Sequence, residues 1–444
     1  MIALLAALLL GGLSMDGDLR LEGRGGPAVA GQPTSTGGPA VAGQPTSTGS
    51  ASADFSVRSG ERNLLVLGGI APQVVVVADT AGTSIARAFT RAFAAVEVRD
   101  RESWRFRVRQ SVGYGTIDLS PLGSLSAAAV QATAFPGAQP PPDKRFVLVG
   151  ESETTAALEI ALSRRGRLIG DVGWLVSGGA DSTARCYLPL SRGPRLHAAV
   201  AFQQSRLDEL DVDISAFDTR YSNDPSFCSS YSAIPYRRRA SAAGAMFDWR
   251  RTMGRGATVR LGAGPALGRA EDPLAGVNVS LLPAVRADVQ LEPDALGERG
   301  LSMSLRIGAE PVGDQVSGYL VERGGVSPGV AWVAFPELKL EARATGSIAL
   351  TSGLSPVQQT LPDTVSARTM RGDLYAQSEL RATWSPTLQE DISIGARWAW
   401  LSHPQGGLPA TQWNLFVSVS FHLFRTRAVV NGDARAAPPA GRLK

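Results

Sequence analysis

The sequence predicts an all-β fold, a transmembrane antiparallel β-barrel of about 16 strands, on three observations. Polar and apolar residues alternate along many long segments. No run of 18 or more apolar residues is present, so no segment is long enough to be a transmembrane helix. The connections between the alternating segments are short and long in turn, as they are between the strands of outer-membrane barrels.

The alternation is clearest in residues 338–350. Leu340 and Ala342 fall on one side of this segment, and Glu341 and Arg343 fall on the other. A strand directs successive side chains to opposite faces, so the segment has one apolar and one charged face. Strands of soluble sandwiches have about 5–6 residues, whereas a two-faced strand of about 10 residues is typical of a membrane barrel.

Sixteen strands are expected where such runs are bounded by clusters of Gly, Pro, Asp or Ser. They span 62–79, 87–98, 104–117, 153–163, 167–178, 194–204, 208–219, 237–250, 255–267, 276–292, 300–310, 326–335, 337–352, 372–385, 390–402 and 411–424. Residues 84–95 also fit an amphipathic helix, and residues 74–77 do not alternate at all. A 14-strand barrel with an extra N-terminal segment therefore stays open.

The two classes of connection assign the two rims of the barrel. The short connections are 99–103, 164–166, 205–207, 251–254 and 386–389, and the long ones are 118–152, 179–193, 220–236, 311–325 and 353–371. Short turns are periplasmic in outer-membrane barrels and long loops are extracellular. Both ends of the barrel then lie at the periplasmic rim, which requires an even number of strands.

The chain is expected to have four parts. Residues 1–14 have the apolar core of a signal peptide, and residues 15–61 are expected to be a disordered linker. The linker holds a tandem repeat of GGPAVAGQPTST over residues 25–48, too poor in apolar residues to form a core. The barrel covers residues 62–424, and a polar tail covers 425–444.

Charged residues share the inward face of the predicted strands, because charges are excluded from hydrocarbon. These expected pore-lining residues are Arg105, Arg107, Arg109, Glu159, Asp211, Asp213, Arg286, Asp288, Arg306, Glu310, Glu341, Arg343, Glu379, Arg381, Asp391 and Arg397. The first three form an arginine ladder that would favour anions. Carboxylates on adjacent strands, such as Glu97 or Glu159, would instead neutralise it. About 16 strands leave an aqueous channel unless it is plugged, and the small apolar residues at 124–134 resemble a porin's constriction loop.

Two further sets of residues are expected to have structural roles. Tryptophans near strand ends on the apolar face predict an interfacial girdle of Trp104, Trp249, Trp384, Trp398, Trp400 and Trp413. Cys186 and Cys228 fall in two expected extracellular loops that flank one strand pair. Because the exported compartment is oxidising, a disulfide between these two cysteines is expected.

The composition disfavours several classes of function. The net charge is +4, and nearly all of the positive charges are arginines. The chain has no dense basic block with interleaved aromatic residues, so nucleic-acid binding is not expected. The three histidines, His197, His403 and His422, lie in no recognisable Ser or Asp motif. No nucleotide-binding or metal-ligand spacing is present, so no enzyme activity, cofactor or metal is expected.

The final predicted strand, residues 413–424, alternates and ends on an aromatic residue. It resembles the closing strand of porin-like Gram-negative outer-membrane β-barrel proteins, which implies an outer-membrane location and insertion by the barrel-assembly machinery. The segments 176–181, 188–190 and 192–194 are similar to barrel proteins of social and predatory Gram-negative bacteria. That similarity implies a location and no activity.

These observations predict a passive, porin-like channel in contact with outer-membrane lipid, through which small solutes or ions are selected by size and charge. The alternative is a sealed barrel that is structural or presents its extracellular loops to other cells. An outer-membrane enzyme is the third hypothesis, and the histidine inventory disfavours it.

Overall fold

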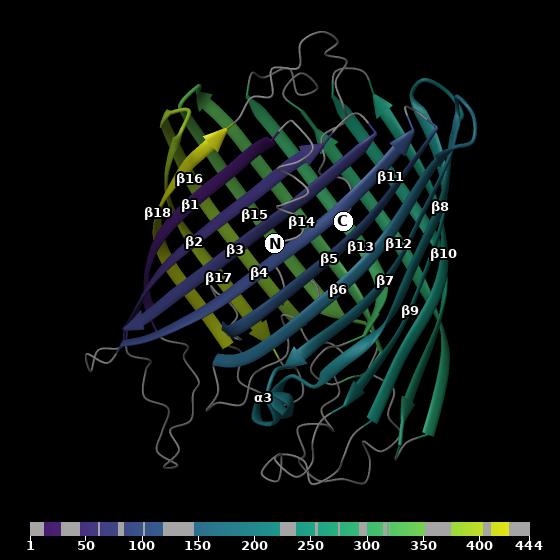
Figure 1. Cartoon of the computed structure of the whole chain (residues 1–444), viewed down its shortest axis with the longest axis horizontal. Coiled ribbons are helices and arrows are strands. Elements are labelled where there is room, and N and C mark those ends of the chain that lie inside the picture. The colour runs from purple at the N-terminus through teal and green to yellow at the C-terminus, as the bar shows by residue number, and fades with distance from the viewer. Residues whose placement is uncertain are drawn as a thin grey trace.

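The computed structural model is a closed antiparallel β-barrel of 18 strands (Figure 1). It describes residues 13–27, 45–60, 63–78, 84–100, 103–118, 146–222, 237–253, 256–273, 276–292, 300–313, 318, 320–350, 374–402 and 410–425. The predicted barrel is confirmed, and the predicted strand number of about 16 is corrected to 18. Within these residues, no helix is long and apolar enough to cross a membrane.

The strands follow one another around the wall in chain order. Their bounds are β1 Leu13–Pro27, β2 Pro45–Gly60, β3 Leu64–Ala78, β4 Ser84–Asp100, β5 Trp104–Asp118, β6 Phe146–Ala161, β7 Gly166–Gly179, β8 Leu190–Gln203, β9 Asp208–Ser222, β10 Arg237–Met253, β11 Ala257–Asp272, β12 Gly276–Leu291, β13 Leu301–Gly313, β14 Leu320–Phe335, β15 Leu338–Ala349, β16 Leu374–Thr387, β17 Glu390–Ser402 and β18 Ala410–Arg425. The helix α3, Ser182–Tyr187, lies between β7 and β8.

The two additional strands are β1 and β2, which close the barrel because β1 pairs with both β2 and β18. The predicted linker over 15–61 is therefore wrong for residues 15–27 and 45–60. Their Gly, Ser and Thr content hid an alternation in which Leu19 and Leu21 flank Arg20. Residues 1–12 of the predicted signal peptide, 28–44 of the predicted linker and 426–444 of the predicted tail lie outside the described residues, while Leu13 and Ser14 begin β1.

The predicted rims are reproduced by the strand connections. Two residues separate β14 from β15 and β16 from β17 at one rim, whereas the long gaps 119–145 and 350–373 fall at the other. Helix α3 lies at the long-connection rim, drawn at the bottom of Figure 1. Residues 84–100 form β4, so neither the amphipathic helix nor the 14-strand barrel is found.

Over most of the wall, exposed apolar side chains point outward and charged side chains point inward. On β5, Trp104, Phe106 and Val108 are exposed on the outer face, and they alternate with Arg105 and Arg107. In a closed wall, an exposed band of apolar side chains on the outside faces lipid. The same alternation runs through the strand pairs around the barrel.

Four lone prolines within strands interrupt the ladder in the same way. They are Pro72 in β3, Pro194 in β8, Pro265 in β11 and Pro328 in β14. Beside each proline, two successive residue pairs are missing on one side, and the ladder then resumes in register. A proline lacks the N–H that a ladder bond requires, so the gap lies on the side to which that N–H would point.

Candidate channel lining

The arginine ladder is paired across its neighbouring strands. Arg105 Nη2 lies 2.5 Å from Glu159 Oε2 on β6, and Arg107 Nη2 lies 3.0 Å from Glu97 Oε2 on β4. The guanidinium of Arg109 lies 4.9 Å from the ring centre of Phe93. Two of the three charges are thus matched by carboxylates, which weakens the expected preference for anions.

A second cluster spans β7, β8 and β9. The Nδ1 atom of His197 lies 2.8 Å from Asp171 Oδ2, and its Nε2 atom lies 3.2 Å from Asp213 Oδ1. Both ring nitrogens therefore face carboxylates, so neither is placed to accept a proton from a nearby hydroxyl. The geometry fits a lining residue better than a catalytic base.

Asp248 on β10 is the centre of a third cluster. Its fully buried side chain lies 2.8 Å from Arg260 Nη2 and 3.8 Å from Arg286 Nη1. Arg260 also lies 3.9 Å from Asp211 Oδ2. One buried carboxylate thus holds arginines from β11 and β12, which compensates for its burial.

Shorter pairs follow on the next strands. Arg306 Nε donates to Asp288 Oδ1 at 2.9 Å, and Arg343 Nη2 donates to Glu341 Oε1 at 3.1 Å. Lys339 Nζ reaches the same Glu341 oxygen at 2.8 Å. These pairs lie on β12, β13 and β15.

The closing seam of the barrel carries the most connected group. Arg397 Nε lies 2.6 Å from Glu379 Oε2, and its Nη1 atom lies 2.9 Å from Glu22 Oε1. Glu379 also pairs with Arg381 at 2.6 Å, and Glu22 with Arg20 at 2.6 Å. Glu22 therefore joins β1 to β17 across β18.

Several inward-facing charges are open to solvent. The side chain of Arg343 is 71% exposed and that of Arg306 is 56% exposed, and Glu310 is exposed as well. An inward side chain is exposed only where it borders a space inside the wall. Asp391, by contrast, is partly buried and lies 3.0 Å from His422 Nε2 near the periplasmic rim.

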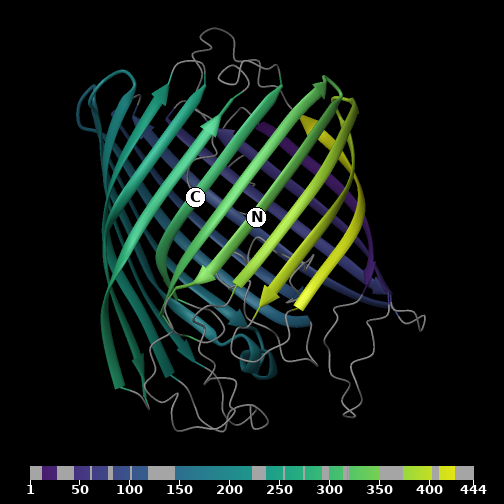
Figure 2. The same ribbon diagram turned by 180° about the vertical axis from the view of Figure 1, so that it is seen from behind.

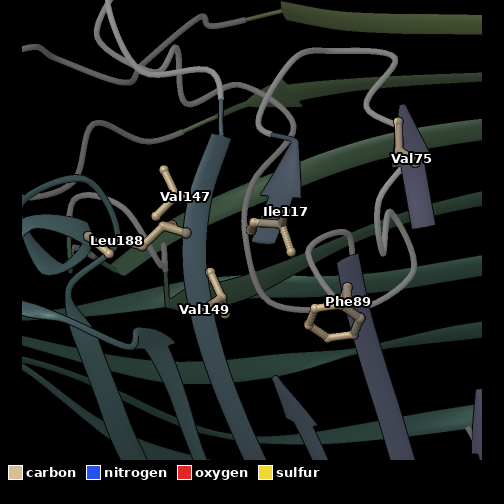
Figure 3. Close-up of a cluster of buried hydrophobic side chains, with 7 residues drawn as sticks. Val75, Phe89, Ile117, Val147, Val149 and Leu188 are labelled. Atoms are coloured by element: carbon tan, nitrogen blue, oxygen red, sulfur yellow. The ribbon is translucent and has the colours of Figure 1, made fainter. Parts of the chain in front are cut away.

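Two buried apolar clusters lie on the inner wall in its extracellular half. On β3–β6, Val75, Phe89, Ile117 and Val147 are buried together with Leu188, which follows α3 (Figure 3). A second buried cluster joins Tyr221, Ala240, Ala242, Ala270, Leu282 and Leu320 on β9–β12 and β14. The extracellular half of the inner wall thus adds buried apolar clusters to its charges, among them the buried ion pair of Arg238 with Asp272 at 2.7 Å.

The short helix α3 brings its connection onto the first apolar cluster. Asp181 caps the helix, because its Oδ1 atom accepts the N–H of Ala184 at 2.7 Å. Arg185 Nε donates to the carbonyl of Gly179 at 3.1 Å. Ala184 and Leu188 then pack against the inner faces of β5 and β6.

All eight tryptophans of the chain lie on outward-facing strand positions. Trp104, Trp384, Trp398 and Trp413 of the expected girdle are exposed, as are Trp174 and Trp332, which were not predicted. Trp249 is less exposed and donates its Nε1–H to Asp208 Oδ1 at 3.2 Å; Trp400 is also partly buried. Tryptophans occur near both rims, as in an interfacial girdle.

Two expectations fall on residues that are not described. Cys228 and the side chain of Cys186 lie outside the described residues, and so does the pore-mouth segment 124–134. The disulfide and the constriction by that segment stay predictions. Within the described residues, no group of three or more His, Cys, Asp or Glu side chains is placed to hold a metal ion.

Several lining residues were missed by sequence reasoning, among them Glu22, Asp248, Asp171 and Arg260. Glu22 was placed in the linker, although its alternation with Leu21 was visible. Asp248 lies between Phe247 and Trp249, and Asp171 lies between Gly170 and Val172, so only the neighbouring strands reveal their charged partners.

The fold is similar to those of solved outer-membrane proteins. The FrpB iron transporter from Neisseria meningitidis (F5-1 variant) aligns with a TM-score of 0.50 at 8% identity, over 92% of this chain and 82% of that chain. OccK2 from Pseudomonas aeruginosa in complex with glucuronate aligns at 0.45 and 10% identity, over 94% and 99%. OccAB2 from Acinetobacter baumannii aligns at 0.42 and 10% identity, over 92% and 98%.

At these identities the similarity shows the fold alone. With the apolar outer band, it places the chain in the outer membrane of a Gram-negative bacterium. No curated protein matches the sequence. A family model does match: residues 107–404 fit the EpsX exopolysaccharide export family.

Proposed function

The chain belongs to the EpsX exopolysaccharide export family, and on that premise we propose that it is the channel through which an exopolysaccharide crosses the outer membrane. The cargo is a polymer rather than the small solutes or ions suggested by the strand pattern. The mechanism stays passive, since selection by size and charge requires no covalent step.

The observation that supports this proposal best is the paired, water-accessible lining. Arg306 with Asp288, and Arg343 with Glu341, offer donors and acceptors side by side on an exposed inner wall. Sugar hydroxyls both donate and accept hydrogen bonds, so they exchange water for such a wall at little net change in free energy. Pairing also leaves little net charge to hold a passing chain.

A test of this proposal is deletion of the gene in the parent bacterium. Polysaccharide on the cell surface should be lost, and the wild-type gene should restore it. The matched control is the same complementation with Leu340→Arg, a lipid-facing substitution expected to impair barrel insertion. Unchanged surface polysaccharide in the deletion strain would contradict the proposal.

A second candidate function is a sealed barrel that acts in cell-surface interactions. The buried apolar clusters in the extracellular half of the lumen favour it, because apolar side chains that pack together narrow the passage. Single-channel recording separates the two candidates, since a permanently sealed barrel carries no current under any condition.

A further inference from the structure

Between β12 and β13 the ladder does not resume after its prolines, unlike the four ladders interrupted by one proline. The ladder between these strands runs from the pair Leu291–Met303 to the pair Val285–Ala309 and stops there. If the register continued, Pro283 would come to lie opposite Pro311 two positions further on. Beyond this point, the described part of β12 has no partner on its β13 side.

The neighbouring ladders show that both missing donors point into this seam. Pro283 faces Pro265 within the ladder of β11 and β12, and Pro311 faces Glu322 within the ladder of β13 and β14. A strand residue directs its N–H to one neighbour only. Because neither ladder is interrupted at these positions, both prolines lack their N–H on the side of the seam. In the four other ladders, one proline removes two residue pairs. Between β12 and β13, where two prolines would face each other, the ladder ends.

The described ends of β13 and β14 beyond the last β12 pair lie inside the barrel. We call residues 310–313 of β13 and 320–323 of β14 the flap. Leu320 is 2% exposed and packs with Leu282 and with residues from β9, β10 and β11. Those partners are on inward-facing positions, so the flap covers the inner face of four strands instead of continuing the wall.

Two glycines make this close approach possible. A Cβ atom at Gly313 would collide with the Tyr221 hydroxyl, although β9 and β13 are separated by three strands in the barrel order. A Cβ atom at Gly268 would collide with Cδ2 of Leu320. With the native Tyr221 and Leu320 side chains in place, a larger residue at either position would force one of those side chains to shift.

Strands β9–β12, whose inner face the flap covers, extend beyond the flap. In Figure 2, the teal strands at the lower left extend past the ends of the green strands beside them. Ion pairs lie on their outer face, where Arg239 is 2.6 Å from Asp218 and Arg269 is 2.5 Å from Glu271. Charged pairs of this kind stand outside hydrocarbon, so the free edge of β12 lies where water reaches its backbone.

We propose that the flap is the gate of the channel. This inference rests on the proposed function, because it takes the lumen as the path of the cargo. Apolar burial of Leu320 holds the flap against the inner face of β9–β12 in the extracellular half of the lumen, and the ladder between β12 and β13 ends before it. A chain arriving from the charged periplasmic half displaces it toward the gap beside β12, and it folds back afterwards.

The first test restores the ladder. Pro283→Val with Pro311→Val supplies the two missing N–H donors, so the flap should join the wall, and the mean conductance in a planar bilayer should rise several-fold. The control is Pro265→Val, which adds a donor beside β10 and should leave the conductance at the wild-type value. The proposal is overturned if the folded double variant conducts like wild type, or if Pro265→Val raises the conductance equally.

The second test locks the flap and does not depend on the proline variant folding. Gly268→Cys with Leu320→Cys, made together with Cys186→Ser and Cys228→Ser, should cross-link and lower the conductance, and a reductant should restore it. The control is a disulfide between two strands that are already paired, formed by Gln377→Cys on β16 and Ala399→Cys on β17. Equal conductance in the oxidised and reduced protein, or failure to cross-link, overturns the proposal.

Both recordings are made without polysaccharide. The conductance measurements can therefore refute gating by the flap without affecting the result of the gene deletion. The gene deletion can likewise refute polysaccharide export without affecting the conductance results.

Discussion

At the scale of single residues, the lining is defined by how its charges pair. Arg105 and Arg107 each have a carboxylate on a neighbouring strand, so the ladder presents polar atoms with little net charge. A wall of this kind suits a hydrated polymer, because it offers hydrogen bonds without a strong field.

Removing the paired carboxylates should leave the positive charges of Arg105 and Arg107 unneutralised in the lumen. With Glu97→Gln and Glu159→Gln together, we expect the reversal potential under a salt gradient to shift toward anions, since guanidinium groups stay charged at any working pH. Replacing Arg105, Arg107 and Arg109 with serine should shift it toward cations by freeing the same carboxylates. If both variants shift in the same direction, the pairing is not what sets selectivity.

The two faces of a strand should respond differently to arginine. Leu340→Arg or Ile394→Arg places a charge on the exposed apolar face and should reduce the free energy of unfolding by about 2–4 kcal/mol near the middle of the bilayer. Thr345→Arg, on the inner face beside Ser327, should have a small effect. Urea unfolding in lipid vesicles measures the difference, and equal losses on both faces would refute the lipid-facing assignment.

At the scale of elements, the strands could be predicted where alternation was strong and missed where composition concealed it. Every strand from β3 to β18 overlaps a predicted one, and β15, β16 and β17 agree within a few residues. The first two strands were lost because Gly, Ser and Thr dominate them. Their ladder bonds come from the backbone, which carries no signature in the side chains.

The candidate site was predictable only in part, for a related reason. Inward-facing charges follow from alternation within one strand, whereas their partners depend on the register between strands. Glu97 and Glu159 were found because short turns fix the register of adjacent strands. The contact of Glu22 with Arg397 joins opposite ends of the chain, and the approach of Gly313 to Tyr221 spans three intervening strands. Neither contact leaves a local pattern.

The capped helix at the extracellular rim should respond to loss of its cap. Asp181→Ala removes the acceptor for the Ala184 N–H and should destabilise α3 by about 1 kcal/mol. The Leu188 amide, which donates to the Ala184 carbonyl, should then exchange its hydrogen faster. Hydrogen exchange followed by mass spectrometry checks this, with a β16 amide as the unaffected control.

The disulfide prediction also belongs to this scale. Cys186 lies in the connection between β7 and β8, and Cys228 falls in the one between β9 and β10, at the same rim. We expect unreduced peptide mapping of protein from native envelopes to recover the two cysteines joined. Two free thiols would refute the bridge.

At the scale of the whole molecule, the periplasmic half of the lumen is lined by paired charges, and the extracellular half adds two buried apolar clusters. A hydrated chain would enter the first zone easily and meet the flap in the second. Apolar constrictions of this kind gate channels by excluding water. The arrangement reconciles an accessible lining with an extracellular half that is closed at rest.

The central claim, that a polysaccharide travels through this lumen, is tested most directly by current blockade. Wild type and the Pro283→Val/Pro311→Val variant are recorded in planar bilayers while purified exopolysaccharide of the parent bacterium is added at the periplasmic rim. We expect transient blockades of the current whose duration increases with the length of the polysaccharide. A steady ion current in conducting channels, at every polymer length tried, would contradict it.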